Sequence, residues 1–445
     1  FRSVVCATDA LARLQTFGVP LLQDAAVDPL ALGVTIGLTT LAGLTCGLLP
    51  AFHLALHQRS QTLQASSHQR TAGRGSAFAR NVLVVSEVAL ACVLLVAAGL
   101  LLRSFNAVLQ VNLGFQPRQA MSWRIDPQRN FQSGGEVDTY LGGLAQRVAA
   151  LPGVESVGFS DTLPLSRNRT WGAGAVGVEY PKDQYPSADP RLVDAGYLPT
   201  MKIPLVAGRY FDEHFDPKAP KAVIVNENLA RALFPDHRNP LGAKIRVNGE
   251  SVIIGVVANV RTSSLEQAGG NEMYLDCRQC GDWSALEMVV RSSRPLASLA
   301  PDVRAAIAAH DPAIPNLEFY ELDRLIDDAV APRRLITRLL GFFSALALTL
   351  AALGLYGVIA YSVVQRTQEI GIRMAIGAQR HHVLQLVLRG GLKLVGLGIM
   401  LGLIASFALT RLLDSLLFGV TAYDPLAFIG NATLLLIVSL LACLL

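Results

Sequence analysis

Two cysteines are the residues whose spacing points most directly to chemistry. Cys277 and Cys280 stand in the sequence CRQC, and such a pair is compatible with half of a metal site, a redox pair or a local disulfide. The chain has 6 cysteines, and the others are scattered singly, so no second pair completes a zinc site. We predict no metal centre. In an oxidising compartment we predict a local disulfide, with two reduced thiols as the alternative.

Other candidates for catalysis are few. His214 and His237 lie far apart in the sequence without the spacing of metal ligands, and the scattered carboxylates fit a solvated face. We find no nucleophile–base pair, and the chain contains no G-x-x-x-x-G-K-[ST] phosphate loop. The sequence therefore predicts a protein that is not an enzyme, with no catalytic residue and no bound cofactor.

The composition favours a membrane protein with more than one structural unit. The mean hydropathy is +0.40 and 16% of the residues are charged, which is too apolar for an ordinary soluble protein. A length of 445 residues exceeds what one hydrophobic core usually organises. The net charge of +4, with no basic stripe interleaved with aromatic residues, does not favour a nucleic-acid partner. Because the chain opens at Phe1 and stops at Leu445 inside an apolar run, we expect a fragment.

Five apolar stretches are long enough to cross a bilayer as helices, which takes about 20 residues. They cover approximately residues 29–50, 82–104, 339–363, 392–412 and 425–445. Buried helices of a large soluble protein are the alternative, which the uncharged length of the third stretch disfavours.

Glu87 is the one acid inside these spans, near one end of the second. A charge at mid-bilayer costs roughly 2.5 to 3.5 kcal/mol on insertion scales. Near the membrane edge the side chain can reach the interface or pair with Arg80. We predict a structural role at a helix interface rather than a proton relay.

Arginines in the short connections predict the orientation. Residues 51–81 contain 4 arginines and no acid, and residues 364–391 contain 4 arginines and one acid, Glu369. Both connections therefore belong in the cytoplasm. Alternation then places residues 105–334 outside, together with the N-terminal stub 1–28 and the turn 413–424.

The two ends of the chain resemble each other. Residues 28–50 and 424–445 both begin Asp-Pro-Leu-Ala, and they align at a constant offset. Four shared residues are also compatible with chance, but we prefer an internal duplication. One repeat would then comprise four spans with a large outside domain after its first span, and the two copies would run parallel. The span 29–50 would end the first repeat, and the span 82–104 would begin the second.

The outside region 105–334 reads as a folded α+β domain. Strand–helix–strand patterns occur before and after an insert at about 166–284, which predicts a split ferredoxin-like lobe adjoining the membrane. The insert is rich in strand patterns and carries a hairpin signal at Asn248 and Gly249. We therefore expect a second, mostly β lobe.

The connection RTQEIGIRMAIGAQRHH, residues 366–382, is too polar to enter the membrane. Glu369 and Arg373 stand four apart in the order that stabilises a helix by about 0.2 to 0.5 kcal/mol. Ile370 and Met374 form an apolar face, and small residues keep this face low, so another protein can approach the backbone. An interfacial helix resting on lipid headgroups is the alternative.

This connection resembles that of the MacB/FtsX-like ABC transporter permeases, where the segment docks on a separate nucleotide-binding subunit. Further stretches share the resemblance over nearly the whole chain, namely LVVSEVALACVLLVAAGLLLRS, GYLPTMKIPLVAGRYF, VIVNENLARALFPDHRNPLGAKI and GLLPAFHLA. The tandem form resembles the duplicated, acidobacterial-type permeases. Most of the first repeat and the basic C-terminal tail of the family are missing, and the family pattern does not include CRQC.

The resemblance implies a multi-pass α-helical membrane protein whose extracytoplasmic domain has a porter-like lobe and an inserted sabre-like lobe. It assigns contact with the ATPase to Glu369, Ile370, Gly371, Arg373, Met374, Gly377 and Ala378. It implies a homodimeric ABC ATPase partner that holds ATP and Mg²⁺, membrane lipid, and a periplasmic adaptor or outer-membrane component, at the bacterial inner membrane.

The function implied is the permease subunit of an ABC transporter that exports an amphiphilic compound, peptide or lipoprotein. The alternative is a mechanotransmission permease that transports nothing and regulates an extracytoplasmic enzyme or senses a ligand.

Overall fold

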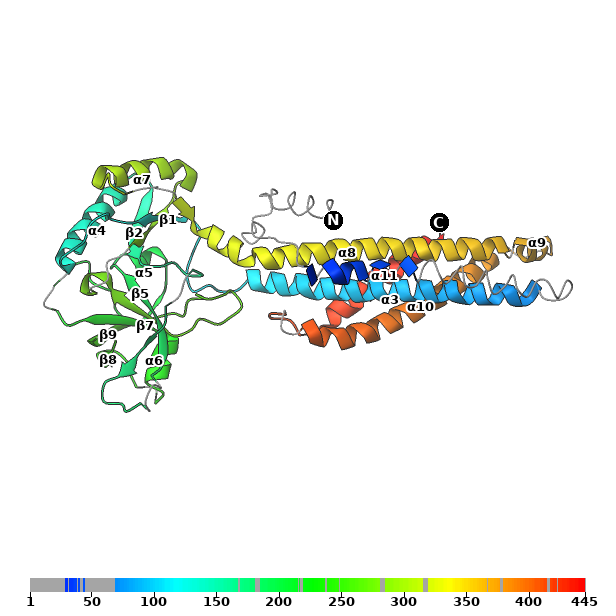
Figure 1. Ribbon diagram of the computed structural model, residues 1–445, viewed down its shortest axis with the longest axis horizontal. Helices are drawn as coiled ribbons and strands as arrows, with labels where there is room; N and C mark the ends of the chain where they lie inside the picture. The colour runs from blue at the N-terminus through cyan, green and yellow to red at the C-terminus, as the bar shows by residue number, and fades with distance from the viewer. Residues whose placement is uncertain are drawn as a thin grey trace. The chain divides into compact units, whose positions relative to one another are not determined.

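The computed structural model of the chain comprises two units, a helical unit of residues 1–109 and 332–445 and an α+β unit of residues 110–331 (Figure 1). The structure describes residues 29–30, 32–37, 39–40, 43–44 and 69–445, the last range except 167–168, 181–184, 215, 217–218, 237, 248, 281–284, 315–318, 366, 377–378, 414–416, 422 and 445.

Four long helices of the described chain contain stretches long and apolar enough to cross a membrane. They are α3 (Gln69–Leu109), α8 (Leu322–Gln365), α10 (Arg380–Leu413) and α11 (Pro425–Leu444). The described residues between 29 and 44 are helical, but much of the predicted span 29–50 lies outside the described residues and stays a prediction.

Helix α8 is longer than the span predicted at 339–363, because it has 44 residues and begins at Leu322. The hydropathy of the sequence indicates only the uncharged part of the helix, which is the predicted membrane span. The helix continues through the charged residues before that part, among them the good helix formers Arg324, Arg333 and Arg334, and it contains Pro332 in its interior. Leu322 is fully buried in a core of the α+β unit, and Leu325 packs against the same core.

Glycines bring α10 close to α3 within the helical unit. A Cβ atom at Gly398 would overlap the side chain of Val88, and one at Gly402 would overlap Cys92. Helices in a membrane approach closely where small residues line the contact. The α3 side of this contact is buried and apolar, as at Val88 and Cys92.

The Asp-Pro pair of the repeat motif begins α11. The carboxylate of Asp424 accepts a hydrogen bond from the backbone N–H of Leu426 at 3.0 Å, which caps the helix, and Pro425 occupies the first helical position, where a missing N–H costs nothing. Asp424 also forms an ion pair with Arg103 of α3. The matching Asp28 lies outside the described residues.

The split ferredoxin-like half of the α+β unit is confirmed. It consists of β1 (Ala120–Ile125), α4 (Gly134–Ala149), β2 (Val154–Ser160), β11 (Leu286–Ser292), α7 (Leu296–His310) and β12 (Phe319–Glu321). The strands lie in the order β12-β1-β11-β2, and all three pairings are antiparallel. The strands before the insert, β1 and β2, therefore alternate in this sheet with the strands after it, β11 and β12.

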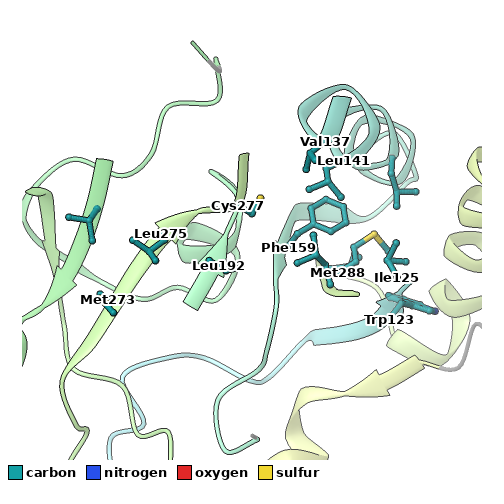
Figure 2. Packing of buried hydrophobic residues seen from close by; sticks show 14 of the residues in the cluster. Trp123, Ile125, Val137, Leu141, Phe159, Leu192, Met273, Leu275, Cys277 and Met288 are labelled. Atoms are coloured by element: carbon teal, nitrogen blue, oxygen red, sulfur yellow. The ribbon is translucent and has the colours of Figure 1, made fainter. Parts of the chain in front are cut away.

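Helix α4 covers this sheet with an amphipathic face. Ser133 caps it by accepting the backbone N–H of Glu136 at 3.3 Å. Its apolar residues recur at helical spacing, so Val137 and Leu141 point to the same side. Figure 2 shows these two side chains packed over Phe159 of β2, with the core of the sheet continuing beneath them.

The strands of the insert continue the same sheet. They are β3 (Trp171–Gly172), β4 (Gly174–Ala175), β5 (Ser187–Val193), β6 (Leu205–Gly208), β7 (Ala222–Asn226), β8 (Lys244–Arg246), β9 (Glu250–Val257) and β10 (Glu272–Asp276). The helices between them are α5 (Tyr197–Thr200), α6 (Glu227–Leu233) and the 3-10 helix η3 (Cys277–Gln279). The order runs β2-β5-β10-β7-β9-β8-β4.

Strands β8 and β9 pair as the predicted hairpin. Gly249 in their turn has φ 106°, a conformation that favours glycine. Asn248 lies outside the described residues.

Two carboxylates strengthen the junction between the ferredoxin-like half and the insert, where β2 and β5 share a single registered residue pair. Asp161 accepts the backbone N–H of Leu192 at 3.0 Å, and Asp194 accepts that of Phe159 at 2.7 Å. These side chains satisfy amides for which the short ladder offers no carbonyl.

A histidine at the end of α7 is packed against α4. The ring centroid of His310 lies 4.9 Å from that of Tyr140, whose hydroxyl donates to Asp311 at 2.9 Å. The Nε2 atom of His310 is buried without a hydrogen-bond partner among the described residues. Burial, and then the positive charge of Arg147, lower the pKa of His310.

This lowered pKa predicts acid-sensitive stability of the α+β unit. As the pH falls below about 6.5, the unfolded chain binds a proton at His310 before the folded chain does, so the free energy of unfolding decreases. Replacing His310 by glutamine is expected to remove the contribution of this residue, measured as a smaller decrease in thermal midpoint from about pH 7.5 to about pH 5.5 than in the native protein. The exposed His214, replaced in the same way, is the control. An unchanged pH dependence in His310→Gln would contradict the assignment.

Candidate functional site

The connection between α8 and α10 contains a short helix, α9 (Thr367–Ala375). The hydroxyl of Thr367 donates to the carbonyl oxygens of Val363 at 3.2 Å and Val364 at 2.8 Å, which satisfies acceptors at the end of α8. The backbone N–H of Ile376 donates to the carbonyl of Ile372 at 3.1 Å and extends the last turn. The segment therefore has defined helical structure before α10 begins.

Glu369 and Arg373 bind each other on the surface of α9. Their side chains form an ion pair at 2.5 Å, and each is about half exposed. The pair is one helical turn apart, so it stabilises α9 by a few tenths of a kcal/mol. Both charges stay accessible to a partner.

Three apolar side chains project from the same connection. Ile372, Met374 and Ile376 are exposed, and Ile376 has 82% of its surface accessible. Ile372 and Ile376 lie one helical turn apart on the same face, and we name these two residues the apolar ridge. Ile370, which the sequence places on the apolar face, is only half exposed. A Cβ atom at Gly371 would meet open space.

Sequence reasoning selects Met374 but misses Ile372 and Ile376. Their signal is the presence of two isoleucines four residues apart in a connection that carries 4 arginines. Gly377 and Ala378 lie outside the described residues, so their assignment stays a prediction. At the start of α10, the tilted rings of His381 and His382 lie with their centroids 4.0 Å apart.

The end of α8 that leads to α9 is held against α3. The guanidinium group of Arg80 lies 4.1 Å from the ring centroid of Tyr361, a cation–π contact. The side chain of Gln365 donates to the hydroxyl of Tyr361 at 2.8 Å. The end of α8 next to α9 therefore contacts α3 through Arg80.

Glu87 lies at the interface between the same helices. Its carboxylate contacts α8 at Gly354, where any Cβ atom would overlap it. Arg80 stacks on Tyr361 instead of pairing with Glu87. Further along the interface the hydroxyl of Ser344 donates to the backbone carbonyl of Leu94 at 3.0 Å.

The remaining sequence candidates lie in the α+β unit. Cys277 begins η3 and is buried, and Cys280 directly follows that helix and is half-buried. Their disulfide stays a prediction. His214 lines a cavity of about 530 Å³, and His237 lies outside the described residues. In the part of the chain that the structure describes, no three His, Cys, Asp or Glu residues are grouped as metal ligands.

Two family profiles match the chain, MacB-like periplasmic core domain over residues 82–310 and FtsX-like permease C-terminal over residues 341–445. The Macrolide export ATP-binding/permease protein MacB of Wolinella succinogenes is 26% identical over 222 residues, which cover 48% of this chain and 34% of that protein. The Uncharacterized ABC transporter permease YknZ of Bacillus subtilis is 24% identical over 221 residues, covering 46% of this chain and 55% of that protein.

Solved structures resemble the chain as well. The periplasmic region of MacB from Actinobacillus actinomycetemcomitans gives a TM-score of 0.34 at 15% identity, covering 50% of this chain and 96% of that chain. The chain spans about a third of the length of the MacB relative and about half that of YknZ. Since the core-domain profile covers more than half of the residues and the permease profile covers the last helices, the chain belongs to the ABC transporter permeases of the MacB/FtsX type.

Proposed function

We propose that this permease couples ATP hydrolysis by a separate ABC ATPase, acting as a dimer, to movement of its α+β unit outside the bacterial cytoplasmic membrane. The work done there is export of an amphiphilic compound, a peptide or a lipoprotein. A periplasmic adaptor or an outer-membrane component would receive the cargo. ATP and Mg²⁺ belong to the ATPase.

The apolar ridge of α9 is the observation that carries this proposal. Ile376 has 82% of its surface accessible and Ile372 lies one turn before it, so a partner that covers both lowers the free energy of the complex. The charged pair Glu369–Arg373 adds polar contacts at the rim of such an interface. The order of the membrane spans and the arginine-rich connections support a cytoplasmic position for α9.

Helix α8 supplies a mechanical route from α9. It is one helix from Leu322 to Gln365, with Pro332 inside it before the apolar span, and its first residue is buried in a core of the α+β unit. The part after Pro332 satisfies its backbone hydrogen bonds internally, so it can tilt in a bilayer as a unit. Force applied next to Gln365 would therefore reach the α+β unit.

Signalling without transport is the second candidate. The burial of Leu322 in a core of the α+β unit supports signalling equally well. A tilt of α8 would change the shape of that unit for a bound enzyme or ligand.

An assay in liposomes distinguishes the two functions. The permease is reconstituted with the ATPase that co-purifies with it, and hydrolysis is measured with hydrophobic compounds, peptides and lipoproteins. Export predicts stimulation of hydrolysis and ATP-dependent movement of at least one cargo. Hydrolysis that responds to none of them would contradict export, and absence of any co-purifying ATPase would contradict both functions.

A further inference from the structure

Arg278, the second residue of CRQC, joins three separate segments of the α+β unit. Its guanidinium group binds Asp276 through two nitrogen atoms at 2.9 and 2.8 Å, and Asp138 of α4 at 3.0 Å. It also donates to the backbone carbonyls of Asp212 at 2.7 Å and Glu213 at 3.0 Å. We name these contacts the Arg278 clasp. Arg278 and Asp276 are buried although both are charged, at 6% and 7% side-chain exposure, whereas Asp138 at the margin is 39% exposed.

The clasp forms one wall of the cavity of about 530 Å³. Asp276, Arg278 and Gln279 line one side, and the segment 209–214, which the clasp holds by its carbonyls, lines another. Gln279 is fixed as well, because its side-chain oxygen accepts the backbone N–H of Ala222 at 2.9 Å. The shape of the cavity therefore depends on the position of η3.

The two cysteines enclose this helix. The backbone N–H of Cys280 donates to the carbonyl of Cys277 at 3.4 Å, so the residues stand one turn apart. Cys277 belongs to the hydrophobic cluster of the α+β unit that Figure 2 shows. Cys280 is partly buried and packs against the margin of that cluster. One cysteine is therefore hidden and its neighbour reachable.

We propose that Cys277 and Cys280 are a modification site, a reversible disulfide that closes η3 and locks the Arg278 clasp around the cavity. This inference goes beyond the permease function. It requires the α+β unit to face an oxidising compartment, and it does not depend on the ATPase.

The reaction needs an oxidant with a disulfide, such as an extracytoplasmic thiol oxidoreductase. The thiolate of the accessible Cys280 attacks one sulfur of that disulfide, forms a mixed disulfide and releases the other sulfur as a thiol. Cys277 then loses its proton and attacks the Cys280 sulfur, which releases the second thiol of the oxidant. Two electrons and two protons pass to the oxidant.

The order of attack follows from burial. Burial, with the charges of Asp276 and Asp194, raises the pKa of the Cys277 thiol, so Cys277 is a poor first nucleophile. Cys280 is therefore the residue that meets the oxidant.

The first test counts thiols of the full chain in freshly isolated membranes. The protein is denatured and its thiols are labelled with a maleimide-linked polymer, once directly and once after reduction. The proposal predicts that the 4 other cysteines react without reductant and that all 6 react after it. Modification of all 6 cysteines before reduction would overturn the disulfide.

The second test measures the consequence for the cavity. Hydrogen exchange of residues 209–214 is compared in the oxidised protein, the reduced protein and Cys280→Ser, all as the full chain in nanodiscs. Loss of the disulfide is expected to speed exchange about tenfold and to lower the thermal midpoint of the α+β unit by about 4 °C. Reduction of the native protein gives the answer even if the variant folds poorly.

Cys92→Ser in α3 is the matched control and should leave this exchange unchanged. Equal exchange in the oxidised and reduced proteins would overturn the locking of the clasp.

Discussion

Gly402→Leu is expected to destroy the packing of the helical unit. A Cβ atom at this position would lie 2.6 Å from the Cβ of Cys92 and 2.9 Å from the backbone carbonyl oxygen of Ala89. Backbone cannot move aside as the end of a flexible side chain can, so the two helices must separate. Overpacking in a tight core costs typically 1 to 3 kcal/mol, and we expect about 3 kcal/mol here. That is more than a hundredfold change in the ratio of folded to unfolded protein.

The measurement is the yield and thermal midpoint of the full chain in detergent. Gly396→Leu is the matched control, since it lies in the same helix and a Cβ atom there meets nothing within 4 Å. We expect the control to behave like the native protein. Equal stability of the two variants would show that α3 and α10 do not pack as described.

Ile376→Glu, alone or with Ile372→Glu, is expected to release the ATPase. Covering a large aliphatic side chain contributes about 1.5 to 3 kcal/mol, and a buried carboxylate without a partner adds a penalty. The single variant should therefore weaken co-purification of the ATPase at least tenfold, and the double variant should abolish it. Because both side chains are exposed in the permease itself, its folding should not change.

Val178→Glu is the control, an exposed apolar residue of the α+β unit changed in the same way. It should leave the association intact. If α9 instead rests on lipid headgroups, Ile376→Glu would leave the ATPase bound. That outcome would contradict the docking role of the apolar ridge.

Local patterns predict much of the fold. The apolar–polar alternation in the sequence of β1 and the helical spacing of α4 are strong signals, although every residue of β1 except Arg124 is buried, and a strand followed by a helix returns in β11 and α7. Their recurrence around an insert was sufficient to predict the split ferredoxin-like half. The continuous sheet was not predictable, because β5 pairs in parallel with β10, about 80 residues later, and no local pattern encodes such a partner.

For the functional residues too, local patterns were predictable and contacts between distant segments were not. The position of α9 between two spans and the Glu369–Arg373 pair follow from spacing alone. The exposure of Ile372 and Ile376 does not, because a helix of 9 residues has too few turns to show which face its neighbours cover. The Arg278 clasp joins residues 140 positions apart, Asp138 and Arg278, so only the folded chain reveals it.

A photoreactive side chain at position 376 tests most directly whether the ATPase acts on this permease through α9. Illumination of membranes containing the full chain is predicted to link the permease to an ATP-hydrolysing subunit, and the yield should change with bound nucleotide. An adduct with lipid alone, or labelling of this position by an impermeant reagent from outside intact cells, would contradict the account.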